Sequence, residues 1–216
     1  MRASDSPPLA LALRRASLLS GVQTLTRSDP RLGRLVARHG PPPLWARRPG
    51  FASLLRIILE QQVSLASARA IYQRVATAVG DVQPAGIVTL GTKGLQGLGL
   101  TRQKASYICG VAEQTLDGQL MLHRLGRYGD GEARAHLMRV RGIGPWTANI
   151  YLLMALRRPD IWPPGDLALH KALGRLIGSA SIPSSAEAER LALRWRPLRA
   201  VAARILWHAY LSERAA

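Results

Sequence analysis

Apolar residues recur at helical spacing along almost the whole chain, and this rhythm limits the possible folds more than any other feature. Ala68, Ile71, Val75 and Val79, for example, follow the period of about 3.6 residues that places side chains on one face of a helix. No segment shows a convincing alternation of apolar and polar residues, which is the pattern of a half-buried strand. We therefore predict an all-α protein with roughly nine or ten helices.

Prolines, glycines and capping residues mark where these helices begin and end. Asp29 followed by Pro30 is typical of an N-cap and a first helical residue, and predicts a helix that reaches about Arg38. Ser184 and Glu187 have the spacing of a capping box. Further signals predict a buried helix over 51–60, a glycine-rich turn over 94–99, a helix over 105–116, a helix over 131–140 capped by Asp130, a helix over 146–156 that is apolar except at Asn149, and a last helix from Pro197.

The tight turn between the helices over 131–140 and 146–156 creates a helix-hairpin-helix. Gly142 and Gly144 suit this turn because it requires positive φ or the absence of a Cβ atom. Without side chains, their N–H groups can reach a phosphate, and the positive N-terminal end of the second helix faces the same anion. Such contacts hold a DNA backbone without reading its sequence. A plain turn between two helices explains the same residues.

A single carboxylate follows the second of these helices. Asp166 comes directly after Pro163, Pro164 and Gly165 and precedes an apolar helix, so an N-cap is the simplest interpretation. Only one helix separates Asp166 from the hairpin, which is enough to return the chain to the hairpin's neighbourhood. A carboxylate held there can stabilise positive charge that develops on a sugar and can orient a water molecule, as in glycoside hydrolysis.

The charge of the chain indicates a polyanionic partner. There are 30 Lys and Arg residues against 13 Asp and Glu residues, which gives a formal net charge of +17. Such a field favours binding to nucleic acid through the release of counterions. Two alternatives remain: arginine richness that reflects codon bias, and association with ribosomes or with a membrane surface.

Cysteine and hydropathy exclude several other classes. Cys109 is the single cysteine, which rules out an internal disulfide and a cysteine-ligated zinc or iron–sulfur centre. No apolar run approaches the roughly 20 residues of a membrane span. The apolar stretch Pro8–Leu13 is too short for a signal peptide. We expect a cytoplasmic protein, associated with the nucleoid if it is bacterial, that needs no cofactor and no membrane.

At the hairpin and at Asp166 the chain resembles the helix-hairpin-helix–Gly/Pro–Asp superfamily of DNA glycosylases, and within it the alkylpurine glycosylases of the 3-methyladenine glycosylase II type. The resemblance covers about residues 51–210. Four blocks carry it, in the family's order, over residues 58–64, 141–148, 158–166 and 195–207.

The resemblance implies two helical subdomains that flank a cleft. Residues 1–50 form an N-terminal helical segment that packs with the C-terminal part. Residues 51–157 form a central helical subdomain that contains the helix-hairpin-helix (131–156), and residues 158–216 contain the Gly/Pro–Asp loop and the C-terminal helices.

The resemblance also assigns roles to individual residues. Asp166 is the catalytic carboxylate, and Trp146, Trp207 and Tyr151 line the base pocket. Gln61 or Gln62 falls in the loop that fills the gap left in the duplex. The other predicted DNA contacts are Arg141, Gly142, Ile143, Gly144, Lys171 and Arg199, although Lys171 and Arg199 also read as solvated surface residues. The implied partner is double-stranded DNA with a damaged base, bound by a monomer, with a monovalent cation at the hairpin carbonyls as an open question.

The implied activity is hydrolysis of the N-glycosidic bond of a flipped-out alkylated purine, which leaves an abasic site. Flipping costs a few kcal/mol, least for a damaged pair. A cationic base such as 3-methyladenine is attracted to an indole face by about 0.5–2 kcal/mol, although core packing explains Trp146 and Trp207 equally well. Two rival functions remain: a glycosylase for an oxidised or deaminated base, and a DNA-binding protein without catalysis.

Two departures from the family pattern carry information. Bifunctional members of the family place a Schiff-base lysine where this chain has Trp146, so we predict a monofunctional enzyme that leaves the strand intact. The bacterial inducible type has a tyrosine where this chain has Ile150, and the side chain of the neighbouring Tyr151 would point in a different direction from that tyrosine. We therefore expect a base pocket of different shape. His170 lies one helical turn after Asp166 on the same face, and a structural or phosphate-contacting role suits it.

Overall fold

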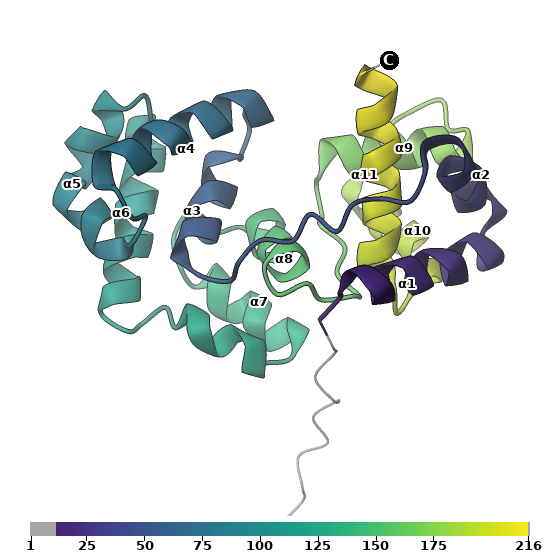
Figure 1. Cartoon of the computed structure of the whole chain (residues 1–216), viewed down its shortest axis with the longest axis horizontal. Coiled ribbons are helices and arrows are strands. Elements are labelled where there is room, and N and C mark those ends of the chain that lie inside the picture. Colours follow the sequence, from purple (N-terminus) through teal and green to yellow (C-terminus); the bar gives the residue numbers. More distant parts are fainter. Residues whose placement is uncertain (1–11, 216) are drawn as a thin grey trace, which may run out of the picture. The chain divides into compact units, whose positions relative to one another are not determined.

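The computed structural model describes residues 12–215, and every regular element in this range is a helix (Figure 1). The all-α prediction is therefore confirmed for the described part of the chain. The elements in chain order are α1 (Arg15–Ser28), α2 (Pro30–His39), α3 (Phe51–Leu59), α4 (Leu65–Val79), α5 (Pro84–Gly97), α6 (Arg102–Leu116), the 3-10 segment η1 (Leu122–Arg127), α7 (Asp130–Met138), α8 (Pro145–Met154), α9 (Leu167–Ile177), α10 (Ser185–Ala192), the 3-10 segment η2 (Leu193–Trp195) and α11 (Arg199–Ala215).

Two compact units divide the described residues. The first contains residues 47–151, and the second combines residues 12–46 with residues 152–215. The expectation about a signal peptide falls largely on residues 1–11, which lie outside the described range. None of the described helices is both long enough and apolar enough to span a membrane.

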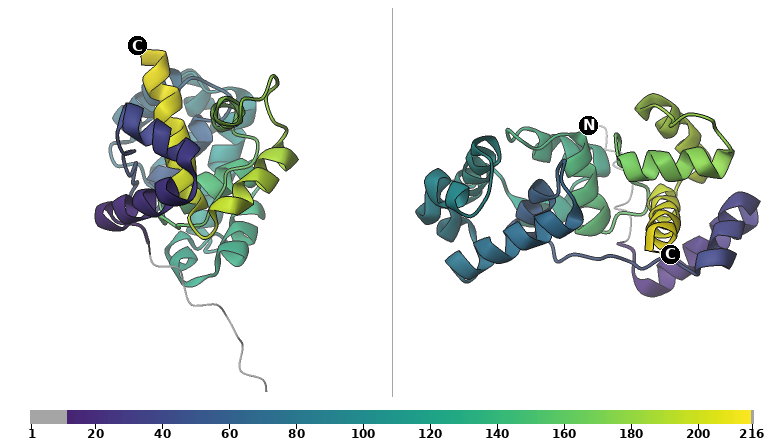
Figure 2. Two further views of the ribbon diagram at one scale, coloured as in Figure 1. Left: turned by 90° about the vertical axis from the view of Figure 1, so that its right-hand side faces the viewer. Right: turned by 90° about the horizontal axis from the view of Figure 1, so that it is seen from above.

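Helices α3, α5 and α6 supply the core of the first unit. Leu54, Ile57 and Ile58 of α3 are completely buried, and α3 contacts both α4 and α6. α5 and α6 pack against each other (Figures 1 and 2). Because α3 is buried on most of its circumference, it is a rigid base for the loop that follows it.

α5 corrects the prediction of a glycine-rich turn over 94–99. The helix continues to Gly97, and only the following residues turn the chain, with Gly99 at φ +97°. The break in the helix lies earlier, at Gly91, where φ is +66°. Glycine disfavours a helix by about 1 kcal/mol relative to alanine, so the local sequence argued against α5. Packing on α6 outweighs that preference.

In the second unit the N-terminal helices pack against the last helix. α1 and α2, in purple, lie beside α11, in yellow (Figure 2). Small residues of α11 are fully buried at Ala200, Ala202 and Ala203 and let neighbouring helices approach closely. Gly21 of α1 has the same effect, because a Cβ there would lie 3.2 Å from the side chain of Val201.

A buried arginine connects three segments of the second unit. Arg204 of α11 is 0% exposed, and its guanidinium donates to the carbonyl oxygens of Leu44 at 2.9 Å, Ala200 at 2.9 Å and Leu153 at 2.8 Å. Burial lowers the pKa of Arg204 to about 10. Desolvating a charge is costly, and the three carbonyl dipoles offset that cost while they hold the chain after α2 and the end of α8 on α11.

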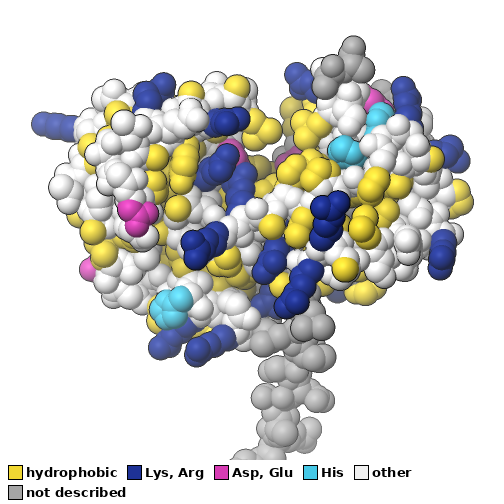
Figure 3. Space-filling view, viewed as in Figure 1, with side chains coloured by type: hydrophobic (Ala, Val, Ile, Leu, Met, Phe, Trp, Pro, Cys, Tyr) yellow, Lys and Arg dark blue, Asp and Glu magenta, His cyan; other side chains and the backbone are white. Residues whose placement is uncertain are grey.

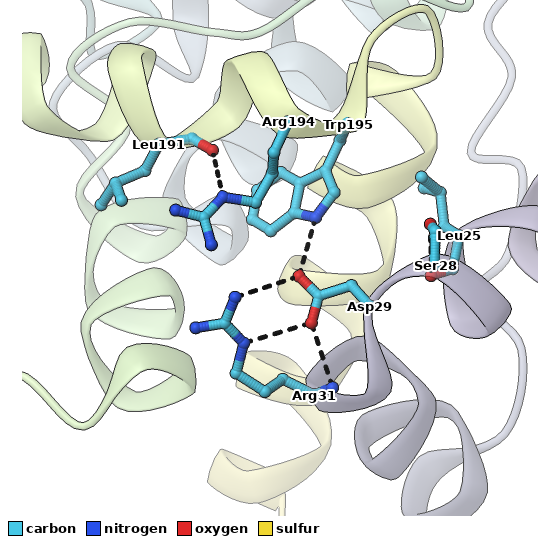
Figure 4. Close-up of polar contacts among 7 residues, drawn as sticks. All are labelled: Leu25, Ser28, Asp29, Arg31, Leu191, Arg194 and Trp195. Atoms are coloured by element: carbon cyan, nitrogen blue, oxygen red, sulfur yellow. Dashed lines mark hydrogen bonds and ion pairs between the residues drawn. The ribbon is translucent and has the colours of Figure 1, made fainter.

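The corner between α1 and α2 is fixed by a buried carboxylate (Figure 4). Asp29 caps α2, as predicted, by accepting from the N–H of Arg31 at 3.1 Å. It also accepts from Nε of Arg31 at 3.1 Å and from the indole Nε1 of Trp195 at 3.1 Å. Burial alone raises the pKa of Asp29, but these hydrogen bonds outweigh it and hold the pKa below its ordinary value. Arg31, Trp195 and the neighbouring Arg194 line a recess of about 250 Å³.

Other helix boundaries follow local signals with small shifts. Ser184 and Glu187 form the predicted capping box at the start of α10. Asp130 is the first residue of α7 rather than its cap, because Gly129 takes the N-cap position. The last helix begins at Arg199 instead of Pro197, since the extended backbone at Arg196 (ψ 143°) separates η2 from α11.

Candidate functional site

The turn between α7 and α8 is built around Gly142. Its φ is +92°, a conformation that L-residues with a side chain rarely adopt. A Cβ there would also lie 2.6 Å from Cγ of Tyr107 on α6. Ile143 is only 4% exposed and anchors the turn, and its N–H donates to the carbonyl of Val140 at 3.1 Å. Glycine at position 142 is therefore required by the protein's own packing.

Gly144 differs from Gly142 in its surroundings. A Cβ at this position would meet no atom within 4 Å, so packing inside the protein leaves room for a side chain. Within the described residues, the N–H groups of Gly142 and Gly144 donate to no acceptor. α8 begins directly afterwards, and the first N–H groups of a helix point out of its N-terminus. The absent side chain leaves these N–H groups open to an anion.

A buried amide holds the two hairpin helices together. Asn149, the one polar interruption expected in α8, is 3% exposed. Its Oδ1 accepts from Nε of Arg134 on α7 at 3.1 Å, and its Nδ2 donates to the carbonyl of Pro145 at 2.7 Å. Asn149 therefore ties α7 to the N-terminal end of α8 and fixes the angle at which the turn is presented.

The loop after α3 contains Gln61 and Gln62, either of which the sequence predicted as the residue that fills the gap in the duplex. The structure places them in different environments. Nε2 of Gln61 donates to the carbonyl of Gly142 at 3.0 Å and to Oγ1 of Thr147 at 2.7 Å, so Gln61 is bound to the hairpin. Gln62 is exposed and has a φ of +56°. A non-glycine residue in this region costs about 1–2 kcal/mol. The carbonyl of Gly142 accepts from Gln61 through one of its two lone pairs.

α6 supports the hairpin and the loop from one face. Nζ of Lys104 donates to the carbonyls of Leu59 at 3.0 Å and Gln61 at 2.6 Å. Burial lowers the pKa of Lys104. Tyr107, one turn further along, lies under Gly142, and the guanidinium of Arg141 lies over its ring, 5.7 Å from the centroid.

Neither of these α6 residues was predicted from the sequence. The available signals were their helical spacing and the rarity of lysine, since only 3 of the 30 basic residues are lysines.

In the second unit, Asp166 has the geometry of an N-cap and of an oriented carboxylate. Its Oδ1 accepts from the N–H of Leu169 at 2.9 Å, which begins α9. The same oxygen accepts from the indole Nε1 of Trp207 on α11 at 3.1 Å. Asp166 is half-buried, and Trp207 is 7% exposed. Two directional donors therefore hold a carboxylate that still reaches the surface at the N-terminus of a helix.

These features coincide with one known family. Residues 55–197 match the HhH-GPD superfamily of base excision DNA repair proteins. The chain belongs to this superfamily. The turn at Gly142 and Gly144 and the Pro163–Asp166 segment both lie within the matched residues.

Several HhH-GPD proteins are similar to the chain. The DNA-3-methyladenine glycosylase of Bacillus subtilis is 29% identical over 169 residues, covering 73% of this chain and 56% of that protein. DNA-3-methyladenine glycosylase 2 of Escherichia coli is 30% identical over 193 residues, covering 82% of this chain and 64% of that protein. A further Bacillus subtilis relative, named "Putative DNA-3-methyladenine glycosylase YfjP", is 26% identical over 184 residues, covering 82% of this chain and 64% of that protein. The chain thus spans 56% to 64% of the length of these curated relatives.

Solved HhH-GPD structures share the fold over nearly the whole chain. The DNA-3-methyladenine glycosidase of Bacillus halodurans has a TM-score of 0.74 and 28% identity, covering 99% of this chain and 95% of that one. The 3-methyladenine DNA glycosylase of Schizosaccharomyces pombe, solved in complex with abasic DNA, has a TM-score of 0.78 and 24% identity, with 87% and 95% coverage. The similarity to the Schizosaccharomyces pombe structure shows that the two chains share a fold.

Some residues predicted from the HhH-GPD pattern serve the fold. Tyr151 is completely buried, and its hydroxyl accepts from the N–H of Gly50 at 2.9 Å. Burial raises the pKa of Tyr151 to about 12. Its side chain therefore offers no exposed surface for a base in this structure. Trp146, at the first turn of α8, is half-buried, and its place in a base pocket stays a prediction.

The basic and imidazole side chains singled out in the second unit differ in availability. Arg199 donates to Asp160 at 2.8 Å and 2.9 Å, so its charge is already paired and its contact with DNA stays a prediction. Lys171 is half-buried. His170 is 6% exposed, and its Nε2 has no hydrogen-bond partner among the described residues.

On the surface in Figure 3, dark-blue basic side chains are spread widely, and magenta acidic ones are sparse.

Proposed function

We propose that the protein is a monofunctional DNA glycosylase that hydrolyses the N-glycosidic bond of an alkylated purine and leaves an abasic site. The observation that carries this proposal is the carboxylate of Asp166, oriented at the start of α9 by Leu169 and Trp207. The names of the curated relatives, DNA-3-methyladenine glycosylases, support the substrate class.

Each step of the reaction has residues suited to it. The N–H groups of Gly142 and Gly144 hold a phosphate, and this contact fixes the duplex without reading bases. Gln62, exposed in the loop after α3, is suited to fill the gap that the flipped nucleotide leaves. The sugar then develops positive charge as the base departs, and the fixed carboxylate of Asp166 stabilises it.

The absence of a strand-cleaving step follows from one residue. A covalent imine needs an amine, and the lysine that supplies it in bifunctional members of the family falls two residues after Gly144, where this chain has Trp146. We therefore propose that the products are a free base and an intact strand that carries an abasic site.

Base release from duplexes that contain 3-methyladenine, hypoxanthine or uracil tests the proposal. Asn caps a helix about as well as Asp, and its Oδ1 can still accept from Trp207, so Asp166→Asn removes the charge with little change in structure. We expect single-turnover release of 3-methyladenine to fall at least about 100-fold in this variant. Asp117→Asn, at an exposed position after α6, is the matched control.

Three results would contradict the proposal. Binding without release from any of the duplexes by the unaltered protein would favour a DNA-binding module. Faster release of uracil or hypoxanthine than of 3-methyladenine would favour another lesion. An adduct trapped by borohydride on an abasic duplex, together with strand scission, would contradict monofunctionality.

A further inference from the structure

One face of α6 touches two surfaces that the proposed function assigns to DNA. Lys104 contacts the loop after α3 through two carbonyls, and Tyr107 lies under Gly142 of the hairpin. Residues three apart on a helix lie on the same side. The hairpin and the loop are therefore supported by a single helix of the same compact unit.

Gln61 completes the connection between these surfaces. Its carbonyl is held by Lys104 at 2.6 Å, and its side-chain amide is held by Gly142 at 3.0 Å and Thr147 at 2.7 Å. Both ends of the residue are therefore fixed. The peptide that leads into Gln62 is attached to α6 on one side and to the hairpin on the other.

Gln62 needs such support because its backbone is in an unfavourable conformation. At φ +56°, a glutamine persists only where surrounding contacts over-determine the backbone. The hydrogen bonds of Lys104 and Gln61 fix the backbone directly before Gln62. Val63, directly after it, is 41% exposed, so packing on that side is weak.

We propose that Lys104 and Gln61 form a brace that holds the backbone of Gln62 in place before DNA binds, which makes Lys104 a positioning residue for insertion into the duplex. The inference rests on the proposed function, in which Gln62 fills the gap. Without the brace, the loop populates several conformations, and ordering it becomes part of the cost of opening the duplex. The chemical step at Asp166 does not depend on this brace.

The test uses Lys104→Met, which keeps an unbranched side chain only one atom shorter and removes the ammonium donors. Lys93→Met, at an exposed position of α5, is the matched control. A duplex with a tetrahydrofuran abasic analogue and 2-aminopurine opposite it reports insertion by fluorescence and requires no catalysis. We expect a reduced fluorescence change for Lys104→Met, as for Gln62→Gly, and an unaltered change for Lys93→Met.

Base release gives a second readout that a general loss of structure would not reproduce. We expect Lys104→Met to slow single-turnover release of 3-methyladenine from a duplex about tenfold, since ordering one loop residue costs this much. Release from a single-stranded oligonucleotide, where no gap is filled, should change less than about twofold. Lys104→Arg retains a charged donor and should recover most of the duplex rate.

The possible outcomes separate the inference from the proposed function. Equal losses on duplex and single strand, or a fluorescence change like that of the unaltered protein, would overturn the brace. If the unaltered protein releases no base but Lys104→Met still weakens insertion, the proposed function fails and the brace stands.

Discussion

The indole Nε1 of Trp207 donates to Oδ1 of Asp166 at 3.1 Å, and the N–H of Leu169 donates to the same oxygen at 2.9 Å. The bond from Leu169 lies within the first turn of α9, whereas the bond from Trp207 comes from α11. Because both act on one oxygen, they hold that oxygen in place from two directions. Trp207, predicted as a wall of the base pocket, is thus also a hydrogen-bond donor to the proposed catalytic group.

Trp207→Phe should distinguish the contribution of the indole N–H from that of the aromatic ring. The variant keeps most of the aromatic surface and loses the N–H, so we expect base release to fall about tenfold through misorientation of Asp166. The free energy of unfolding should fall by about 1 kcal/mol. Single-turnover kinetics and urea denaturation measure the two effects.

Trp162→Phe is the matched control, because Nε1 of Trp162 is buried and has no acceptor among the residues described. We expect Trp162→Phe to retain the rate of the unaltered protein. Equal rates for both variants would show that the hydrogen bond to Asp166 contributes nothing to catalysis.

Gly142→Ala should mainly lower the stability of the protein, whereas Gly144→Ala should mainly weaken its binding to DNA. Alanine at position 142 meets the ring of Tyr107 and a φ of +92°, so we expect unfolding to become easier by about 2 kcal/mol or more. Alanine at position 144 meets nothing, so the stability should change little.

The second variant should weaken DNA binding instead. A methyl group at Gly144 obstructs the approach of a phosphate to the N–H groups, and we expect the Kd for an abasic duplex to rise about tenfold. Fluorescence anisotropy and thermal unfolding of both variants check the pair. If a well-folded Gly144→Ala variant binds DNA with unchanged affinity, the turn does not bind a phosphate.

Acid should destabilise the second unit through Asp160. Burial raises the pKa of this carboxyl, but hydrogen bonds from Arg199 and Arg196 outweigh it, so the folded pKa lies below the ordinary value of 3.8. A depressed pKa contributes stability that is fully present above the unfolded pKa and is lost as the pH falls through the folded one. We expect the free energy of unfolding to decline below about pH 4.

Asp160→Asn tests this assignment. The amide cannot ionise, so the variant should be less stable at neutral pH by about 1–2 kcal/mol and should show a shallower acid decline. Urea denaturation from pH 3 to pH 7 measures both. An acid decline as steep as that of the unaltered protein would assign it to other carboxylates, such as Asp29, whose pKa is also lowered.

Tyr151→Phe distinguishes a core residue from a pocket residue. The hydroxyl accepts from Gly50 inside the fold, so we expect a loss of about 1 kcal/mol in stability and an unchanged rate of base release. A change in the ratio of rates for 3-methyladenine and hypoxanthine would instead show that Tyr151 contacts the base.

The sequence by itself determined features that depend on neighbours a few residues away. The helical period identified the fold class, and Asp29, Ser184 and Asp166 were readable as caps because a capping side chain bonds to an N–H two or three residues later. The helical segment over 92–97 could not be predicted in this way, since Gly94 and Gly97 oppose a helix locally and packing on α6 stabilises it.

Only the tertiary structure decided which side chains support the candidate site. Trp207 is 41 residues from Asp166 along the chain, and Lys104 is 43 residues from Gln61. Whether such groups meet depends on how whole helices pack and which way each side chain points, and no local preference encodes that. The same packing separated Gln61 from Gln62. Adjacent in sequence and identical in chemistry, they differ because Gln61 bonds to the hairpin whereas Gln62 is exposed, with its backbone in the left-handed region.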